Sequence, residues 1–254
     1  MAIARALAAQ PQVLLLDEPL SALDAARRQE ILPWLERLRD ELRVPMLYVT
    51  HAADEVARLA DTLVVLEHGR AVACGPVAQV LAQVDTPVLL GDDAGALLHG
   101  RVQHIDTTWH LAAVDVGGSL LWLRDSGLQP GQSVRVRVLA RDVSLALGGL
   151  ADSSIQNALA CKVCCIAPGG HPSQALVQLQ LLSASALPDD PPTLLLARVT
   201  QRALHTLGVC EGEYRVGPHQ VGGLGALKAR RRCNGGVNKF ASSTALMPVK
   251  FEFH

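Results

Sequence analysis

The first 85 residues follow the pattern of strands that alternate with helices. Residues 13–17 form a short continuous apolar run, typical of a strand buried on both faces of a parallel sheet. The stretch MLYVTH, residues 46–51, predicts a second buried strand. Helices are expected at residues 2–10, which are rich in Ala and Leu and stop near Pro11, and at residues 53–60. This order of elements indicates an α/β layer.

A longer helix is expected after Asp24, which can cap it because its side-chain oxygen accepts from free backbone N–H groups of the first turn. Pro33 lies inside this helix, removes a backbone hydrogen bond and predicts a kink. The apolar stripe recurs every three or four residues, at Ile31, Leu35, Leu38 and Leu42.

Residues 62–75 predict two strands joined by a turn at His68 and Gly69, and residues 76–84 predict a helix with proline at its favoured first position. After about Thr86 the helical periodicity stops. Short alternating strands follow between Gly, Pro and Asp turns, most clearly in residues 133–147. This part favours a small antiparallel barrel.

A faint internal repeat supports two barrel-like halves. LLHGRVQHI resembles ALACKVCCI, and LQPGQSVRV resembles GVCEGEYRV.

Composition narrows the possible classes of protein. The chain has 254 residues, of which 49% are hydrophobic, so it can bury the cores of two modest domains. A formal net charge of -1 argues against a general nucleic-acid binder. Neither a membrane-spanning apolar run nor a signal peptide is evident in the sequence.

The six cysteines are interpreted as reduced thiols, because no export signal is evident. CKVCC, residues 161–165, contains a C-x-x-C pair. A zinc site would need a second pair or histidines at a matching spacing, and none is evident. These cysteines are therefore expected to be strand residues, partly in the core.

Candidate chemistry gathers at the ends of the two predicted parallel strands. Asp17 and Glu18 end the first strand and His51 ends the second, at the edge where open α/β sheets bind ligands. Nucleotide hydrolysis needs one carboxylate for Mg²⁺, a second for the attacking water, and a polar group at the γ-phosphate. The alternative is a solvated turn with surface carboxylates and an unremarkable histidine.

LLLDEPLSALD followed by VTH resembles the second half of an ABC-transporter ATPase, and AIARAL resembles the helix after the ABC signature sequence. The resemblance implies that Asp17 is the Walker B aspartate, which holds Mg²⁺ through water. It implies that Glu18 is the catalytic glutamate and His51 the switch histidine. The matching D-loop places Ser21 and Asp24, with Asp17, on the nucleotide-binding surface.

Two segments resemble the ATPase subunit of molybdate importers more than that of sugar importers. They are RRQEILPWLERLRDEL and DEVARLADTLVVLEHGRAVACGP. That implies ATP and Mg²⁺ as cofactors and molybdate as a regulatory or sensed ligand. The implied partners are a second ATPase subunit in a homodimer, a membrane permease and, indirectly, a periplasmic molybdate-binding protein, without nucleic acid. The implied location is cytoplasmic, peripheral on the inner face of the cell membrane.

SSIQNALACKV, residues 153–163, resembles the opening of a molybdate-binding Mop module of the TOBE class. The resemblance implies that Ser154 and Asn157 donate to an oxyanion. Gln156 stands where the family generally has arginine, so one cationic donor is missing. The alternative is a barrel strand with its turn, without oxyanion binding.

A phosphate-binding P-loop needs G-x-x-x-x-G-K-[ST], and no Gly-Lys-Ser/Thr occurs in the sequence. The Q-loop and the LSGGQ signature are absent as well. We therefore expect a chain that begins in the middle of the ATPase domain, through truncation, a wrong start codon or a gene fragment. Alone it is expected neither to bind ATP tightly nor to hydrolyse it, so whether it is an enzyme is left open.

The expected fold is α/β, the C-terminal half of an ABC-type nucleotide-binding domain, followed by a small all-β OB-like barrel. The resemblance ends near Tyr214 and the composition then changes, which suggests a frameshift near Arg215. KARRR in this part is interpreted as a disordered basic tail. The expected boundaries are 1–85 for a partial ABC ATPase domain, 86–97 for a linker, 98–220 for a Mop/TOBE-like domain and 221–254 for the divergent tail.

Three functions remain open from the sequence. The first is the ATP-hydrolysing subunit of an importer for molybdate or a related oxyanion. The second is a surviving oxyanion-binding module without ATPase activity. The third is a non-functional gene fragment that folds poorly, because half a nucleotide-binding domain exposes sheet edges and apolar surface.

Overall fold

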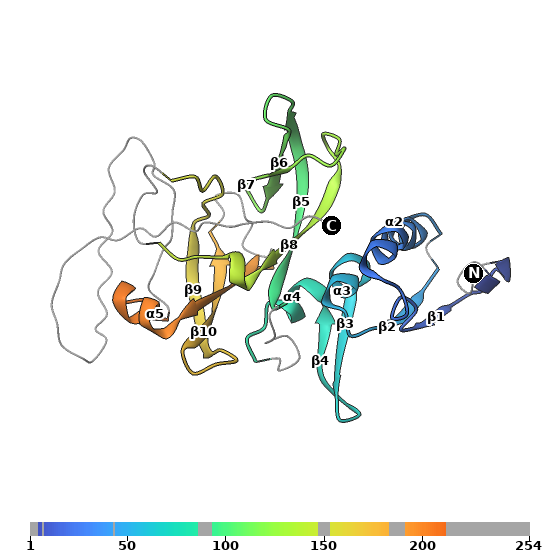
Figure 1. The fold of residues 1–254 in the computed structure, drawn as a ribbon, viewed down its shortest axis with the longest axis horizontal. Helices are drawn as coiled ribbons and strands as arrows, with labels where there is room; N and C mark the ends of the chain where they lie inside the picture. The colour runs from blue at the N-terminus through green and yellow to red at the C-terminus, as the bar shows by residue number, and fades with distance from the viewer. Residues whose placement is uncertain are drawn as a thin grey trace.

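A computed structural model of the chain describes residues 5–6, 8–42, 44–85, 93–146, 153–182 and 191–211. Strands and helices alternate through the first 67 residues, a hairpin and a short helix follow, and strands dominate from Gly95 onward (Figure 1). The expected tail at 221–254 and the expected frameshift near Arg215 lie outside the described residues. Within these residues, no helix is long and apolar enough to cross a membrane.

The first sheet is the predicted parallel pair. β1 (Leu14–Asp17) and β2 (Met46–Val49) run side by side, with Asp17 opposite Val49. The crossover between them is α2 (Ala25–Leu42), and α3 (Ala53–Leu59) follows β2. Of the described residues in the helix expected at 2–10, Arg5, Ala6 and Ala8 are helical, Ala9 lies in a turn and Gln10 has no regular structure.

The core beneath this sheet is built by α2 and its neighbours. Leu20, Leu32, Leu35 and Leu59 are buried together, and Ile31 and Leu38 pack against them. The predicted stripe is thus confirmed at three positions and gains Leu32; the side chain of Leu42 lies outside the described part of the chain. α2 runs through Pro33 as one helix. Its first turn is capped as predicted, because Asp24 Oδ1 accepts from Arg27 N at 2.9 Å.

The prediction that β1 and β2 are buried on both faces is wrong for this chain. Leu14 and Leu16 are buried, but Leu15 is 70% exposed and Leu47 is 61% exposed. Side chains alternate between the two faces of a strand, so these residues share the uncovered face. No described element packs on that face.

The predicted hairpin and its turn are confirmed. β3 (Thr62–Glu67) pairs antiparallel with β4 (Arg70–Pro76). His68 and Gly69 have φ values of 49° and 75°, the left-handed backbone that two-residue hairpin turns need. α4 (Val77–Leu81) begins directly after Pro76.

Two antiparallel sheets form the rest of the described chain. The four-stranded sheet has the order β7-β6-β5-β8, and the three-stranded sheet has the order β11-β10-β9. Their inner faces share one apolar core. The strands are β5 (Gly95–Asp106), β6 (Leu111–Val116), β7 (Ser119–Arg124), β8 (Ser133–Leu139), β9 (Cys161–Pro168), β10 (Gln174–Leu181) and β11 (Leu194–Thr200).

The first pair of segments in the faint repeat falls on one central strand, β5, and one edge strand, β9. The two related segments contain most of β5 and β9, and each of these strands is the first of its sheet and pairs with the next strand. The alternating stretch at residues 133–147 contains the predicted short strand, because β8 runs to Leu139 before a 3₁₀ turn (Ala140–Asp142). A short helix, α5 (Gln201–Leu207), follows β11. β5 begins at Gly95, inside the segment expected to be a linker.

The antiparallel part is attached to α3 through β8. Ala57 of α3 and Val77 of α4 pack with Leu97 of β5. Arg135 donates to Ala60 O at 2.7 Å and pairs with Asp61, beyond the C-terminal end of α3, while Arg137 pairs with Asp54 in its first turn. Two arginines of one strand therefore hold both ends of α3.

Candidate functional site

The carboxyl end of β1 turns sharply at Glu18. Its backbone N donates to Val49 O at 2.9 Å, which continues the pairing with β2 by one residue. Its φ of 40° lies in the left-handed region, a backbone conformation that residues other than glycine rarely adopt. Ser21 Oγ donates to Glu18 O at 2.8 Å and closes the loop. Strain of this kind is concentrated at functional sites in proteins.

The structure brings the two candidate catalytic side chains into contact. His51 Nδ1 lies 2.9 Å from Glu18 Oε1, although the residues are 33 positions apart. An ionised carboxylate only accepts hydrogen bonds, so Nδ1 carries the proton in this contact. The side chains are 78% and 44% exposed, so both remain open to a ligand from solvent.

The other expected nucleotide-site residues lie around this pair. Asp17 is the last residue of β1 and is exposed beside Glu18. Ser21 supports the backbone of Glu18, whereas the carboxylate of Asp24 is engaged at the start of α2, where it accepts from the backbone of Arg27. The described contacts of Ser21 and Asp24 are thus with the loop and the helix.

Asp17 is a suitable carboxylate ligand for Mg²⁺. The described residues contain no group of three or more His, Cys, Asp and Glu side chains that would enclose a metal ion. Magnesium is commonly held by one or two carboxylates and takes its other ligands from water and phosphate oxygens. A single exposed carboxylate at the end of a strand suits that mode of binding.

Sequence reasoning missed a buried carboxylate next to this site. Glu55 is only 2% exposed, and its Oε2 accepts from Tyr48 Oη and from Thr50 Oγ1, both at 2.8 Å. Arg28 of α2 approaches its other oxygen, with Nε at 3.7 Å. Burial, and then the hydrogen bond and charge of Glu55, raise the pKa of the Tyr48 hydroxyl far above its usual value. The sequence showed only an acidic residue four positions after His51 in a predicted helix, and nothing local distinguished it from an exposed helix glutamate.

The two expected oxyanion donors differ in environment. Asn157 is 6% exposed and bonds twice to the backbone of β7: Trp122 N donates to Oδ1 at 2.7 Å, and Nδ2 donates to Trp122 O at 2.8 Å. Its side chain thereby acts like one more strand residue beside β7. Ser154 is exposed in the bend that precedes it. The nearby residues Cys161–Cys165 form part of β9, with Cys161 buried, as predicted.

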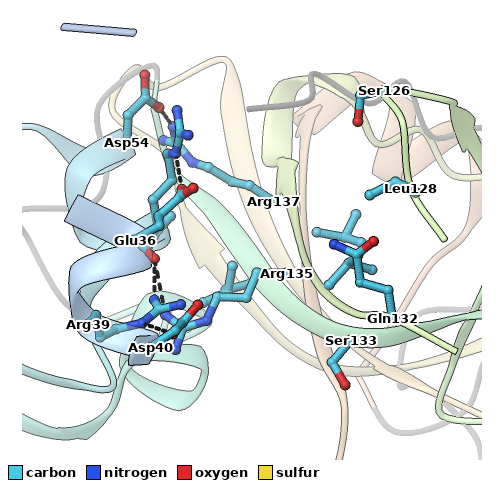
Figure 2. A pocket seen from close by; sticks show the side chains of 15 residues that line it. Glu36, Arg39, Asp40, Asp54, Ser126, Leu128, Gln132, Ser133, Arg135 and Arg137 are labelled. Atoms are coloured by element: carbon cyan, nitrogen blue, oxygen red, sulfur yellow. Dashed lines mark hydrogen bonds and ion pairs between the residues drawn. The ribbon is translucent and has the colours of Figure 1, made fainter. Parts of the chain in front are cut away.

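A cleft separates α2 and α3 from β8 and the turn before it (Figure 2). One wall is charged, and Ser126, Leu128, Gln132 and Ser133 line the other. Each arginine of the lining has an acidic partner, of which Asp61 lies outside the lining. Arg58 pairs with Glu36, Arg39 with Asp40, Arg135 with Asp61 and Arg137 with Asp54. This arrangement favours a contact between parts of the chain over a site for a ligand.

Comparison with known proteins shows which proteins the chain resembles. The chain is 51% identical over 213 residues to the molybdenum import ATP-binding protein ModC of Methylococcus capsulatus, covering 84% of this chain and 57% of that protein. It is 50% identical over 212 residues to ModC of Thiobacillus denitrificans, covering 84% of this chain and 56% of that protein. The chain thus spans little more than half the length of the curated relatives it matches.

The chain was also compared with models of protein families and with solved structures. No family model matches the chain. A crystal structure of the cytoplasmic molybdate-binding protein ModG is similar with a TM-score of 0.35 and 25% identity, covering 46% of this chain and 83% of that one. On the strength of the curated relatives, the resemblance of this chain to the ATP-binding proteins of molybdenum importers is confirmed over 84% of its length.

Proposed function

We propose that this chain contributes the water-activating half of an ATP-hydrolysing site in an importer for molybdate or a related oxyanion. The observation that carries the proposal is the contact between Glu18 and His51 at the ends of two parallel strands. Asp17 lies beside them at the same edge. The names of the curated relatives support molybdenum as the cargo and ATP as the nucleotide.

In this proposal each side chain has one task. Glu18 orients the attacking water and accepts its proton, the usual work of a positioned carboxylate. Asp17 would hold Mg²⁺, which neutralises phosphate charge when bound. His51 faces the γ-phosphate with Nε2. While Nδ1–H is committed to Glu18, Nε2 donates to a phosphate oxygen only in the doubly protonated ring.

The remaining parts of such a site are proposed to come from elsewhere. A P-loop, absent from these 254 residues, must cradle the phosphates. We further propose that the working assembly contains two ATPase subunits docked on a membrane permease at the cytoplasmic face, supplied by a periplasmic molybdate-binding protein. The chain alone is proposed to have no ATPase activity.

The proposal is tested by restoring the missing parts. The chain is fused to the residues of the Methylococcus capsulatus relative that lie outside the matched stretch, and ATP hydrolysis is measured with Mg²⁺. Glu18→Gln keeps the size of the side chain but removes the base, so hydrolysis should fall by about a hundredfold to ten-thousandfold. Glu30→Gln, an exposed change on α2, is the matched control. Equal activity of both variants would refute the assignment.

A second candidate function rests on the loop before β9. Asn157 Nδ2 uses one N–H group for Trp122 O and has a second, and the exposed Ser154 precedes it by three residues. We propose this loop as an oxyanion site for molybdate. Molybdate, but not Mg-ATP, should raise the melting temperature of the unfused chain, and Ser154→Ala should reduce the shift. An aggregating chain that responds to neither ligand would instead support a non-functional fragment.

A further inference from the structure

The buried carboxylate of Glu55 lies at the centre of the contacts around His51. Glu55 is on the side of α3 that packs against β2, and only 2% of it is exposed. Burying a charge is costly unless hydrogen bonds and an opposite charge compensate it. Tyr48, Thr50 and Arg28 supply that compensation. Hydrogen bonds thus hold Tyr48 and Thr50 to Glu55, whereas Arg28 contributes its charge at 3.7 Å and no hydrogen bond from Nε.

Thr50 passes this constraint to the backbone on both sides of His51. Its hydroxyl donates to Glu55 Oε2 at 2.8 Å and accepts from Ala52 N at 3.1 Å. Ala52 is the N-cap residue of α3, and alanine has no side chain that can cap the helix. The Thr50 hydroxyl thus links the backbone N–H of Ala52 to the buried Glu55 Oε2. Thr50 and Ala52 are the residues immediately before and after His51.

The second oxygen of Glu55 faces the helix that follows Glu18. Arg28, in the first turn of α2, has its Nε 3.7 Å from Glu55 Oε1. Arg28 N donates to Asp24 O at 3.0 Å, so the residue that carries this guanidinium closes the first hydrogen-bonded turn after the loop of Glu18. One carboxylate thereby connects the two loops whose side chains meet in the contact between Glu18 and His51.

We propose that Glu55 is a positioning residue that holds His51 against Glu18 by way of Thr50. It does not touch the reacting atoms; it fixes the backbone from which the imidazole projects. The role of this alignment in hydrolysis rests on the proposed function, whereas the alignment itself is a property of the unfused chain. The two statements can therefore fail separately.

The test uses three variants that differ in which link they break. Thr50→Val has nearly the same shape but loses the hydroxyl, and so releases both Glu55 and Ala52 N. Thr50→Ser keeps the hydroxyl and should restore the wild-type result. Tyr48→Phe also removes one hydrogen bond to Glu55 Oε2, but leaves the link through Thr50 intact. It is the matched control for a merely structural loss.

The readout is the nitrogen NMR signals of the His51 ring in the full 254-residue chain, assigned by comparison with His51→Gln. In the wild type, Nδ1 should carry the proton and Nε2 should not, as the contact with Glu18 requires. Thr50→Val should lose this separation and give the averaged signals of a solvent-exposed histidine. Thr50→Ser and Tyr48→Phe should keep it.

Two results would overturn the positioning role. One is a folded Thr50→Val variant with unchanged His51 signals; the other is Tyr48→Phe altering them as strongly as Thr50→Val does. Circular dichroism establishes that each variant is folded. In the ATPase fusion, Thr50→Val should lower kcat by about a hundredfold with little change in KM for ATP, the cost of a misplaced catalytic group. Normal NMR behaviour with no ATPase in the fusion would refute the proposed function and leave the positioning role standing.

Discussion

Replacing Asn157 with alanine tests whether its amide is mainly a structural clamp. The side chain satisfies both backbone groups of Trp122, accepting at 2.7 Å and donating at 2.8 Å. It also joins the segment before β9 to β7 of the other sheet. Alanine removes both hydrogen bonds and provides no replacement for either backbone group.

The expected loss follows from counting these groups. Each hydrogen bond contributes about 1 kcal/mol net, and a buried group left without a partner costs about 1–3 kcal/mol. Trp122 is only partly buried, so water can compensate part of the loss. Asn157→Ala should therefore lower the free energy of unfolding by about 2–4 kcal/mol.

The assay is urea unfolding followed by the fluorescence of Trp122. Trp34 and Trp109 are 67% and 73% exposed, so both can be changed to phenylalanine to leave one reporter. The ring of Trp122 lies 5.3 Å from that of His104 in an edge-on contact, and unfolding should change its emission. The measurement is made without any oxyanion.

Ser154→Ala is the control in the same background. Ser154 is exposed, so the free energy of unfolding should change by less than about 0.5 kcal/mol. A loss for Asn157→Ala no larger than that of Ser154→Ala would refute the clamp. It would show that the double contact with β7 contributes nothing net to the stability of the fold.

Three other outcomes are expected. Burial, with a neighbouring guanidinium, lowers the pKa of His99 below its ordinary value of 6.5. On acidification, the unfolded chain therefore binds a proton at His99 at a higher pH than the folded chain does. The free energy of unfolding should fall as the pH drops below about 6.5, and the urea midpoint should fall less in His99→Gln. Burial raises the pKa of the Cys161 thiol to about 12, so iodoacetamide should label the exposed Cys74 but not Cys161 in the native chain, as mass spectrometry can show. A Cβ on Gly100 would lie 2.5 Å from a valine methyl, so Gly100→Ala should cost about 1–3 kcal/mol, whereas Gly75→Ala, with its nearest atom at 3.5 Å, should not.

Local patterns predicted the first part of the fold well. The apolar runs specified β1 and β2, and the left-handed turn at His68 and Gly69 specified the hairpin. Asp24 could be recognised as a cap because capping depends on a residue and its next three neighbours. The placement of Glu18 and His51 at two strand ends also followed from the sequence, since parallel strands bring their carboxyl ends to one edge.

Features that depend on distant contacts could not be predicted. An apolar run does not reveal whether both faces of a strand are covered, and Leu15 and Leu47 are exposed here. The role of Asn157 depends on Trp122, 35 residues earlier in the chain. Glu55 resembled an ordinary helix glutamate, because neither its burial nor its partners Tyr48 and Arg28 can be read from local spacing.

The ion pairs that join β8 to the two ends of α3 have a thermodynamic consequence. Asp54 and Glu55 are consecutive, so they point about 100° apart around the helix, one toward Arg137 and the other toward the loop of His51. If Glu55 positions His51 as proposed, a ligand of the antiparallel part that shifts β8 would also change the energy of the imidazole's alignment. Reciprocity of linked equilibria requires the converse: a nucleotide that favours one alignment changes the affinity for that ligand by the same factor. The coupling would run through two adjacent carboxylates on a seven-residue helix.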